Sequence, residues 1–245
     1  MGFVPLTPAE LVVGLTITTI AATLQGTIGF GFAVVSVPIL ALVNPLLAPV
    51  PQLLVVLPLT VSMAYRERGA IDLKGFKWVL AGRLLGTGCG IACLALAPKV
   101  VLDIVLATIV LGAVGALTTI AQVPRNPWTE SIAGTFSGIS AMVSAIGGPP
   151  LALLYRDAGG GTLRASLAAL FSIGLVITIG TRALGGFIVK DDIIVAGCLL
   201  PAVLMGLLLS RFFMGRVEGA PLKTAISVVA SLAALGLLAR ALSNV

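Results

Sequence analysis

Two short segments combine glycine with small polar side chains inside otherwise apolar stretches of the chain. The first contains Gln25, Gly26, Thr27, Gly29 and Gly31, and the second contains Ser140, Ser144, Gly147, Gly148 and Pro149. Glycine lets the backbone come close to a ligand, and amide, hydroxyl and carboxamide groups can donate hydrogen bonds to a negative one. These residues are the candidate binding set, and they favour a small anion as the ligand. The alternative is that the small residues only permit close helix packing.

Arg83 and Arg182 fall within apolar runs. A charge inside a membrane usually marks a functional site. Each arginine nevertheless stands only five or six residues from the end of its run, so its guanidinium group can reach the nearer membrane surface. We expect this snorkelling arrangement. In the alternative, both arginines line the path of an anion.

The groups that most catalytic and metal sites need are missing or stand at the wrong depth. The chain has no histidine, and Glu10, Asp103, Asp191 and Asp192 all stand near segment ends. Its three cysteines lie in apolar runs and have neither a disulfide framework nor a zinc spacing. We therefore expect no enzyme, no cofactor, no metal site and no buried carboxylate that relays protons.

The overall composition is that of an integral membrane protein. Of the 245 residues, 58% are hydrophobic and only 10% are charged, and the mean hydropathy is +1.16. Too few charged residues are present to cover a water-soluble surface. The net charge of +6 comes from basic residues scattered between apolar blocks, so we expect the lipid bilayer, and not a nucleic acid, as the surroundings of this chain.

Apolar runs define the expected helices, because a membrane-spanning helix needs about 20 apolar residues. Six uninterrupted runs qualify, at 46–65, 76–97, 100–121, 165–187, 193–210 and 224–242. Two further stretches, 9–43 and 131–155, are interrupted by the glycine-containing segments, at 25–31 and at 147–150. Clustered glycines and prolines do not continue a helix undisturbed. We expect a break at each place, within either a re-entrant hairpin or two full crossings.

The order of these elements occurs twice in the chain. Each half has one broken stretch followed by three uninterrupted runs, and an offset of about 120 positions relates the halves. We expect a first transmembrane repeat at 1–121, a hinge loop at 122–130 and a second, inverted repeat at 131–245. The expected fold is thus an all-α integral membrane protein with two inverted repeats, each a broken helix or re-entrant hairpin followed by three transmembrane helices. Glycines at 82, 86 and 90 are expected to serve helix packing.

The distribution of basic residues predicts the direction of the halves. If each half crosses the membrane an odd number of times, ten basic residues share one side: Arg66, Arg68, Lys74, Lys77, Arg125, Arg156, Arg164, Arg211, Arg216 and Lys223. The other side then has three: Lys99, Lys190 and Arg240. An even number of crossings gives seven against six, which decides nothing. Since loops rich in lysine and arginine remain in the cytoplasm, we expect inverted halves in the cell (inner) membrane, with both termini outside the cytoplasm.

The glycine-containing segments resemble the motifs of a known family. Residues 26–31 with Pro38 resemble the first glycine motif of the TauE/SafE sulfite exporter family, and residues 138–150 resemble its second. The resemblance extends over nearly the whole chain and includes Arg164 and the segment 206–211. It implies a membrane transporter, commonly an exporter, of sulfite, organosulfonates or related small anions.

The residues and the resemblance together predict a transporter that exposes a site near the membrane midplane alternately to the two sides. Export of sulfite, or of an organosulfonate such as sulfoacetate, is the leading function, because the membrane potential drives an anion outward without a coupling ion. The alternatives are an anion channel, or an importer of a small carboxylate or sulfur-containing anion that uses a coupling ion such as a proton or sodium. A homo-oligomer is also compatible with the sequence.

Overall fold

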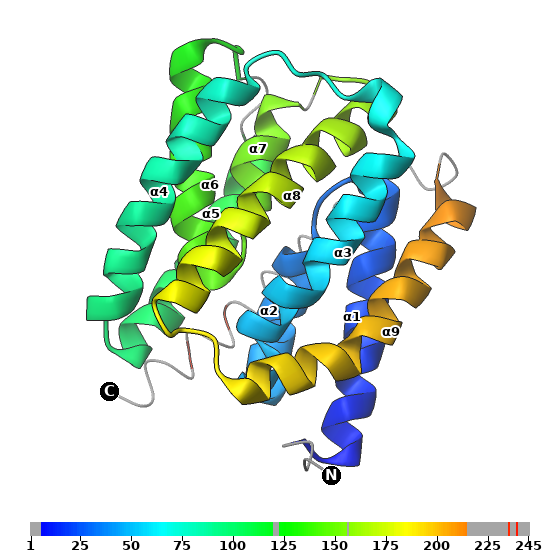
Figure 1. Cartoon of the computed structure of the whole chain (residues 1–245), viewed down its shortest axis with the longest axis vertical. Helices are drawn as coiled ribbons and strands as arrows, with labels where there is room; N and C mark the ends of the chain where they lie inside the picture. Colours follow the sequence, from blue (N-terminus) through cyan, green and yellow to red (C-terminus); the bar gives the residue numbers. More distant parts are fainter. Residues whose placement is uncertain (1–5, 120–122, 156, 215–234, 236–238, 240–245) are drawn as a thin grey trace.

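Figure 1 shows the computed structural model of the chain, which describes residues 6–119, 123–155 and 157–214 and positions 235 and 239. Helices make up the regular structure of this part of the chain, as expected for an all-α protein. In order they are α1 (Pro8–Ile28), α2 (Phe32–Val43), η1 (Pro45–Leu47), α3 (Val50–Arg66), η2 (Arg68–Ala70), α4 (Phe76–Leu96), α5 (Lys99–Thr119), α6 (Pro127–Ser144), α7 (Gly148–Leu154), α8 (Gly160–Leu184) and α9 (Lys190–Phe213).

Five segments of the described chain are long and apolar enough to cross a membrane. They are Pro8–Ile28, Pro45–Arg66, Phe76–Leu96, Gly160–Leu184 and Lys190–Phe213. The last four coincide with predicted uninterrupted runs, and the first is one arm of the broken stretch 9–43. The predicted run 100–121 forms α5, and the run 224–242 lies outside the described residues.

The first predicted break is confirmed. Helix α1 begins after Thr7, which exchanges hydrogen bonds with Glu10 in a capping box, and it ends at Ile28. Gly29 and Gly31 have φ values of 106° and 110°, a left-handed conformation that residues with a side chain rarely adopt. The chain turns at these two glycines, and α2 begins directly after them.

The second break lies slightly earlier than predicted. Helix α6 ends at Ser144, Ala145 has a left-handed φ of 62°, and α7 begins at Gly148. The predicted interruption at 147–150 is therefore wrong for Pro149 and Pro150, which occupy the first turn of α7. First-turn residues need no amide hydrogen for the helix, so proline begins a helix at this position and does not break it.

The second arm of each broken stretch is too short to cross a bilayer. Helix α2 has 12 residues and α7 has 7, which makes them about 18 Å and about 10 Å long, against roughly 30 Å of hydrocarbon. Each second arm packs against the first arm of its own stretch. Of the two expected arrangements, this geometry favours re-entrant hairpins.

Small residues allow two pairs of long helices to pack closely. Helix α4 packs on α6, where a methyl group added at Gly82 would lie 2.1 Å from the Ser131 carbonyl oxygen. Helix α1 packs on α9, where a methyl group added at Gly206 would lie 2.5 Å from Ala22 Cβ. The expectation that the Gly82 run serves helix packing is confirmed.

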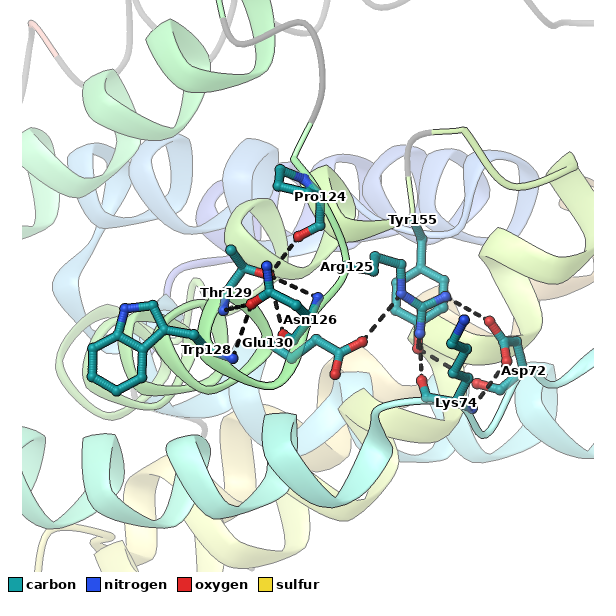
Figure 2. Close-up of polar contacts among 9 residues, drawn as sticks. All are labelled: Asp72, Lys74, Pro124, Arg125, Asn126, Trp128, Thr129, Glu130 and Tyr155. Atoms are coloured by element: carbon teal, nitrogen blue, oxygen red, sulfur yellow. Dashed lines mark hydrogen bonds and ion pairs between the residues drawn. The ribbon is translucent and has the colours of Figure 1, made fainter.

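Arg125, in the loop before α6, ties the second hairpin to the connection between α3 and α4 (Figure 2). Its guanidinium group lies 2.5 Å from Asp72 Oδ2 and 3.3 Å from Glu130 Oε1, and it donates to the Lys74 carbonyl oxygen. The same group lies over the Tyr155 ring, 4.4 Å from its centroid. Because Glu130 lies near the start of α6 and Tyr155 follows α7, this Arg125 cluster holds both ends of the second hairpin.

Candidate functional site

The two helix breaks meet at a cavity inside the described part of the protein. Its volume is about 40 Å³, enough for a few water molecules. The first hairpin contributes Gln25, Gly31, Ala33 and Val34, the second contributes Ala141, Ala145, Ile146, Gly147 and Gly148, and the long helices contribute Val56, Thr60, Arg83, Phe171 and Leu175. Of the candidate binding set, the cavity therefore brings together Gln25, Gly31, Gly147 and Gly148.

Gln25 connects the two arms of the first hairpin. Its side chain is 4% exposed, and its Oε1 accepts a hydrogen bond from the Phe32 amide at 3.2 Å. The amides of Ala33 and Val34 follow in the first turn of α2, where a helix provides no carbonyl partner. Both residues line the cavity, so the N-terminal end of α2, with its partial positive charge, lies beside the cavity.

The glycines of the two breaks differ in how much space surrounds them. A methyl group added at Gly31 would meet no atom within 4 Å, and one at Gly148 would lie 3.6 Å from Phe171 Cζ. At Gly29 and Gly147 the nearest neighbour would lie at 2.9 Å and 3.0 Å. Gly31 and Gly148 thus border open space, whereas Gly29 and Gly147 are closely packed.

Arg83 of α4 is buried at the cavity wall with 1% of its surface exposed. The expected snorkelling is therefore wrong for this residue. The guanidinium group fits against Gly174, where an added methyl group would lie 1.9 Å from its Nε, and its Nη1 donates to Ser137 Oγ at 3.1 Å. Its Nε has no hydrogen-bond partner, and no carboxylate pairs with it, among the described residues.

Arg182 of α8 is also buried, with 2% exposed, so the snorkelling prediction is wrong here too. Its Nε donates to the Met142 carbonyl oxygen at 3.1 Å, and its Nη2 donates to the Met142 and Val143 carbonyl oxygens. These carbonyls belong to the last turn of α6, which has no further amides to bind them. Arg182 thus caps α6, and it is not among the residues that line the cavity.

The remaining candidates lie beside the breaks without lining the cavity. The hydroxyl groups of Thr27, Ser140 and Ser144 donate to carbonyl oxygens of their own helices, at Thr23, Phe136 and Ser140. Gly26 packs against α9, where an added methyl group would lie 2.4 Å from Ser210 Oγ. Pro149 lies in the first turn of α7.

Several lining residues were not predicted. Val56, Thr60, Phe171 and Leu175 come from α3 and α8, and in the sequence they stand within ordinary apolar runs. Ser137, which positions the Arg83 guanidinium and donates to the Gly147 carbonyl oxygen at 2.6 Å, was also missed. Its position one helical turn before Ser140 on α6 is the feature of the sequence that could have indicated it.

Within the described chain, no group of three or more histidine, cysteine or acidic residues could hold a metal ion.

Comparison with known families gives one match. A family model described as "Sulfite exporter TauE/SafE" matches residues 14–237, a range that contains both helix breaks and every lining residue of the cavity. No curated protein and no solved structure matches the chain.

Proposed function

The chain belongs to the TauE/SafE sulfite exporter family, and from this premise we propose that its central cavity binds the anion that it exports. The family consists of membrane transporters and not of enzymes, and the chain is a multi-pass membrane protein. Within this class we propose sulfite, or an organosulfonate such as sulfoacetate, as the substrate. The site would be exposed alternately to the two sides of the cell membrane.

The observation that carries the proposal is the buried Arg83 at the cavity wall. A cation that is removed from water and lacks a carboxylate partner is costly unless another negative group balances it. Among the described residues, none of those that line the cavity is acidic. An anion in the cavity would supply the missing charge, and it would accept a hydrogen bond from the Arg83 Nε, which has no partner among the residues that the structure describes.

The start of α2 supports the same assignment. Ala33 and Val34, in the first turn of α2, border the cavity from the side of the first hairpin, and helix N-termini commonly bind sulfur and phosphorus oxyanions. Discontinuous helices whose N-termini point at an anionic group are a common substrate site in secondary transporters. Gln25, Gly31, Gly147 and Gly148 are therefore the candidate residues whose role as substrate contacts we retain.

The size of the cavity favours the smallest members of the substrate class. A volume of about 40 Å³ has room for only a few water molecules, which suits sulfite better than an anion with a carbon chain. Sulfoacetate would require the two hairpins to move apart. We therefore rank sulfite first.

We propose further that residues 1–121 and 131–245 are inverted repeats joined by the hinge loop 122–130. Helix α4 packs on the first arm of the second hairpin, and α9 packs on the first arm of the first hairpin. Glu10 and Glu130, 120 positions apart, lie in the first turns of α1 and α6. In Figure 1, α3 and α8 run in opposite directions. These correspondences support a twofold relation between the halves.

The end of the molecule that carries the connection between α3 and α4 is proposed to face the cytoplasm. Seven of the ten basic residues predicted for that side are described and stand at or near this end: Arg66, Arg68, Lys74, Lys77, Arg125, Arg164 and Arg211. Lys99 and Lys190 begin α5 and α9 at the opposite end, and the other four predicted positions lie outside the described residues. From a cytoplasm at negative potential, an anion is driven outward by about 2.3 kcal/mol per charge per 100 mV.

A binding screen tests the proposal. The protein in detergent is titrated with sulfite, sulfoacetate, taurine, sulfate and short carboxylates while its unfolding temperature is measured. We expect sulfite to raise the unfolding temperature of the wild type, and Arg83→Gln to weaken this response at least about tenfold because a charge-assisted hydrogen bond is lost. Arg68→Gln, which removes an exposed arginine, is the control. An Arg83→Gln protein that responds to sulfite like the wild type would refute the site.

Flux through liposomes separates a transporter from a channel. Alternating exposure of one site predicts flux that saturates with sulfite concentration, and uptake of labelled sulfite that accelerates when unlabelled sulfite is present inside. Flux that rises linearly, without counterflow, would indicate a channel.

A further inference from the structure

We propose that Arg66 and Arg164 form a second anion subsite, between the central cavity and the membrane face at which α3 ends. The proposal rests on the proposed function of the cavity and extends it to the path that leads there. Glu67 occupies this subsite in the structure and must be displaced by the travelling anion.

The contacts of Glu67 show that the place can bind a carboxylate. Its Oε1 accepts a hydrogen bond from Arg66 Nη2 at 2.9 Å, and its Oε2 accepts one from Arg164 Nε at 3.0 Å. The three side chains are only 12 to 20% exposed. Two guanidinium groups that hold one oxyanion can hold another of similar size, because the same N–H groups serve carboxylate, sulfite and sulfonate oxygens.

Arg66 has more hydrogen-bond capacity than Glu67 uses. Its Nε and Nη1 are buried and have no partner among the described residues, and its Nη2 makes a second, longer contact with the Gly26 carbonyl oxygen at 3.3 Å. Buried donors without acceptors are costly. Two arginines also face a single carboxylate, so the cluster retains one positive charge.

The cluster lies directly against the first helix break. Gly26 belongs to the last turn of α1, and a methyl group added at Gly29 would lie 3.0 Å from both Cα and Cγ of Arg164. The neighbouring residues Gln25 and Gly31 line the cavity. The turn at Gly29 therefore separates the cavity from Arg66 and Arg164, and an anion that passes this turn meets the two guanidinium groups.

Glu67 acts in this arrangement as a tethered competitor. It offsets one of the two positive charges of the subsite when the path is empty and gives way when a free anion arrives. Since its carboxylate is present at a high local concentration, it weakens the apparent affinity for anions that approach from this face. The opposite face of the protein is unaffected.

The first test is Glu67→Gln, a change of equal size that removes the competing charge. Half-saturation of labelled sulfite flux is measured in inside-out and in right-side-out vesicles. We expect the half-saturating concentration to fall about tenfold on the face at which α3 ends, as for the loss of one charge-assisted contact, and to stay unchanged on the other. Asp191→Asn, which removes an exposed carboxylate at the start of α9, is the matched control.

The second test is Arg66→Gln with Arg68→Gln as its control. We expect Arg66→Gln to raise the half-saturating concentration about tenfold on the same face, Arg66→Lys to restore part of the loss, and Arg68→Gln to resemble the wild type. If Glu67→Gln and Arg66→Gln both match their controls, or act equally on both faces, the subsite does not exist.

Arg83→Gln separates this inference from the proposed function. If Arg83→Gln leaves sulfite flux intact while Arg66→Gln weakens it, the cavity assignment fails and the subsite stands. If Arg83→Gln removes flux while Arg66→Gln has no effect, the cavity stands and the subsite is excluded.

Discussion

Arg83 and Arg182 show that two buried arginines of one protein can serve different purposes. Arg182 directs its donors to the carbonyl oxygens of Met142 and Val143 and so completes the end of α6. Within the described part of the chain, Arg83 has a single side-chain partner, Ser137, and its Nε beside the cavity has no partner. The donors of Arg182 are used within the protein, whereas Arg83 retains a donor that a ligand can accept. The hydrogen-bond partners, and not the depth of either residue, therefore distinguish the candidate binding residue Arg83 from the structural residue Arg182.

Gly148→Ala tests the cavity at a lining position where both the backbone and the surrounding space accept a side chain. The added methyl group would lie 3.6 Å from Phe171 Cζ, an ordinary contact, so we expect a folded protein. The methyl group takes space from a cavity of about 40 Å³, and we expect sulfite binding to weaken about tenfold through crowding. Titration with sulfite in the unfolding assay measures the change.

The control for this change is Gly88→Ala, also on a helix, where the added methyl group would meet no atom within 4 Å. Gly88 is exposed and does not line the cavity. Equal sulfite binding by the two variants would contradict a role for Gly148. Gly29 and Gly147 suit this test less well, because an added methyl group there would have neighbours at 2.9 and 3.0 Å and would disturb folding.

From the sequence, the site could be predicted only where glycines and polar residues indicate an interrupted helix. Glycines beside polar residues indicated both breaks, and Gln25, Gly31, Gly147 and Gly148 do line the cavity. The sequence does not determine, however, where a side chain points. The Ser144 hydroxyl donates a hydrogen bond to a carbonyl oxygen of its own helix, an arrangement common for serine within helices. Phe171 has no distinguishing neighbour in the sequence, so its place in the lining could not be foreseen.

At the level of elements, both hairpins are closed at their open ends by polar contacts. In the first, Asn44 Nδ2 after α2 donates to Glu10 Oε1 in α1 at 2.9 Å. In the second, the Arg125 cluster joins the start of α6 to the end of α7. A short arm without such a contact could separate from its partner, because few of its own residues hold it in place.

Acid should release the contact between Arg125 and Asp72. Burial alone would raise the pKa of Asp72, but hydrogen bonds from Arg125 and the Lys74 amide, together with their positive charge, lower the pKa below its ordinary value of 3.8. A carboxyl group whose folded pKa is lowered stabilises the protein above its unfolded pKa and loses this contribution as the pH falls through the folded value. We expect Asp72→Asn to lower the unfolding temperature at pH 7.

At pH values below the pKa of the folded Asp72 carboxyl, the wild type and Asp72→Asn should unfold at the same temperature. Asp191→Asn, at an exposed position on the opposite side of the molecule, serves as the control and should show no such convergence. A difference between wild type and Asp72→Asn that persists unchanged in acid would show that the ion pair does not stabilise the hairpin.

The elements themselves followed well from the sequence, because length, apolar content and helix-breaking residues are local properties. The error concerned Pro149 and Pro150, which were expected to interrupt a helix and instead begin one. A proline is incompatible with the interior of a helix but compatible with its first turn. Only the position of Ala145, with its left-handed backbone, decides between these cases, and alanine gives no such signal in a sequence.

At the level of the whole molecule, the proposed inverted arrangement predicts on which side of the membrane the two termini lie. An odd number of crossings in each half returns the chain to its starting side, so both termini should lie outside the cytoplasm. A reporter fused after Val245 that is active only outside the cytoplasm should give signal, and the same reporter placed in the hinge at 122–130 should give none. Signal from the hinge fusion, or its absence at Val245, would contradict the proposed orientation.

The two prolines in the first turn of α7 also make the two proposed repeats unequal toward an anionic substrate. Two of the first four positions of α7 have no amide hydrogen, whereas α2 offers those of Ala33 and Val34. The polar side chains that border the cavity, Gln25, Thr60 and Arg83, also come from residues before the hinge, and the later residues contribute carbon surface and glycine. Under the proposed function, the half before the hinge would therefore hold the anion while the other half closes over it. During alternating exposure, the anion would move with the half that holds it.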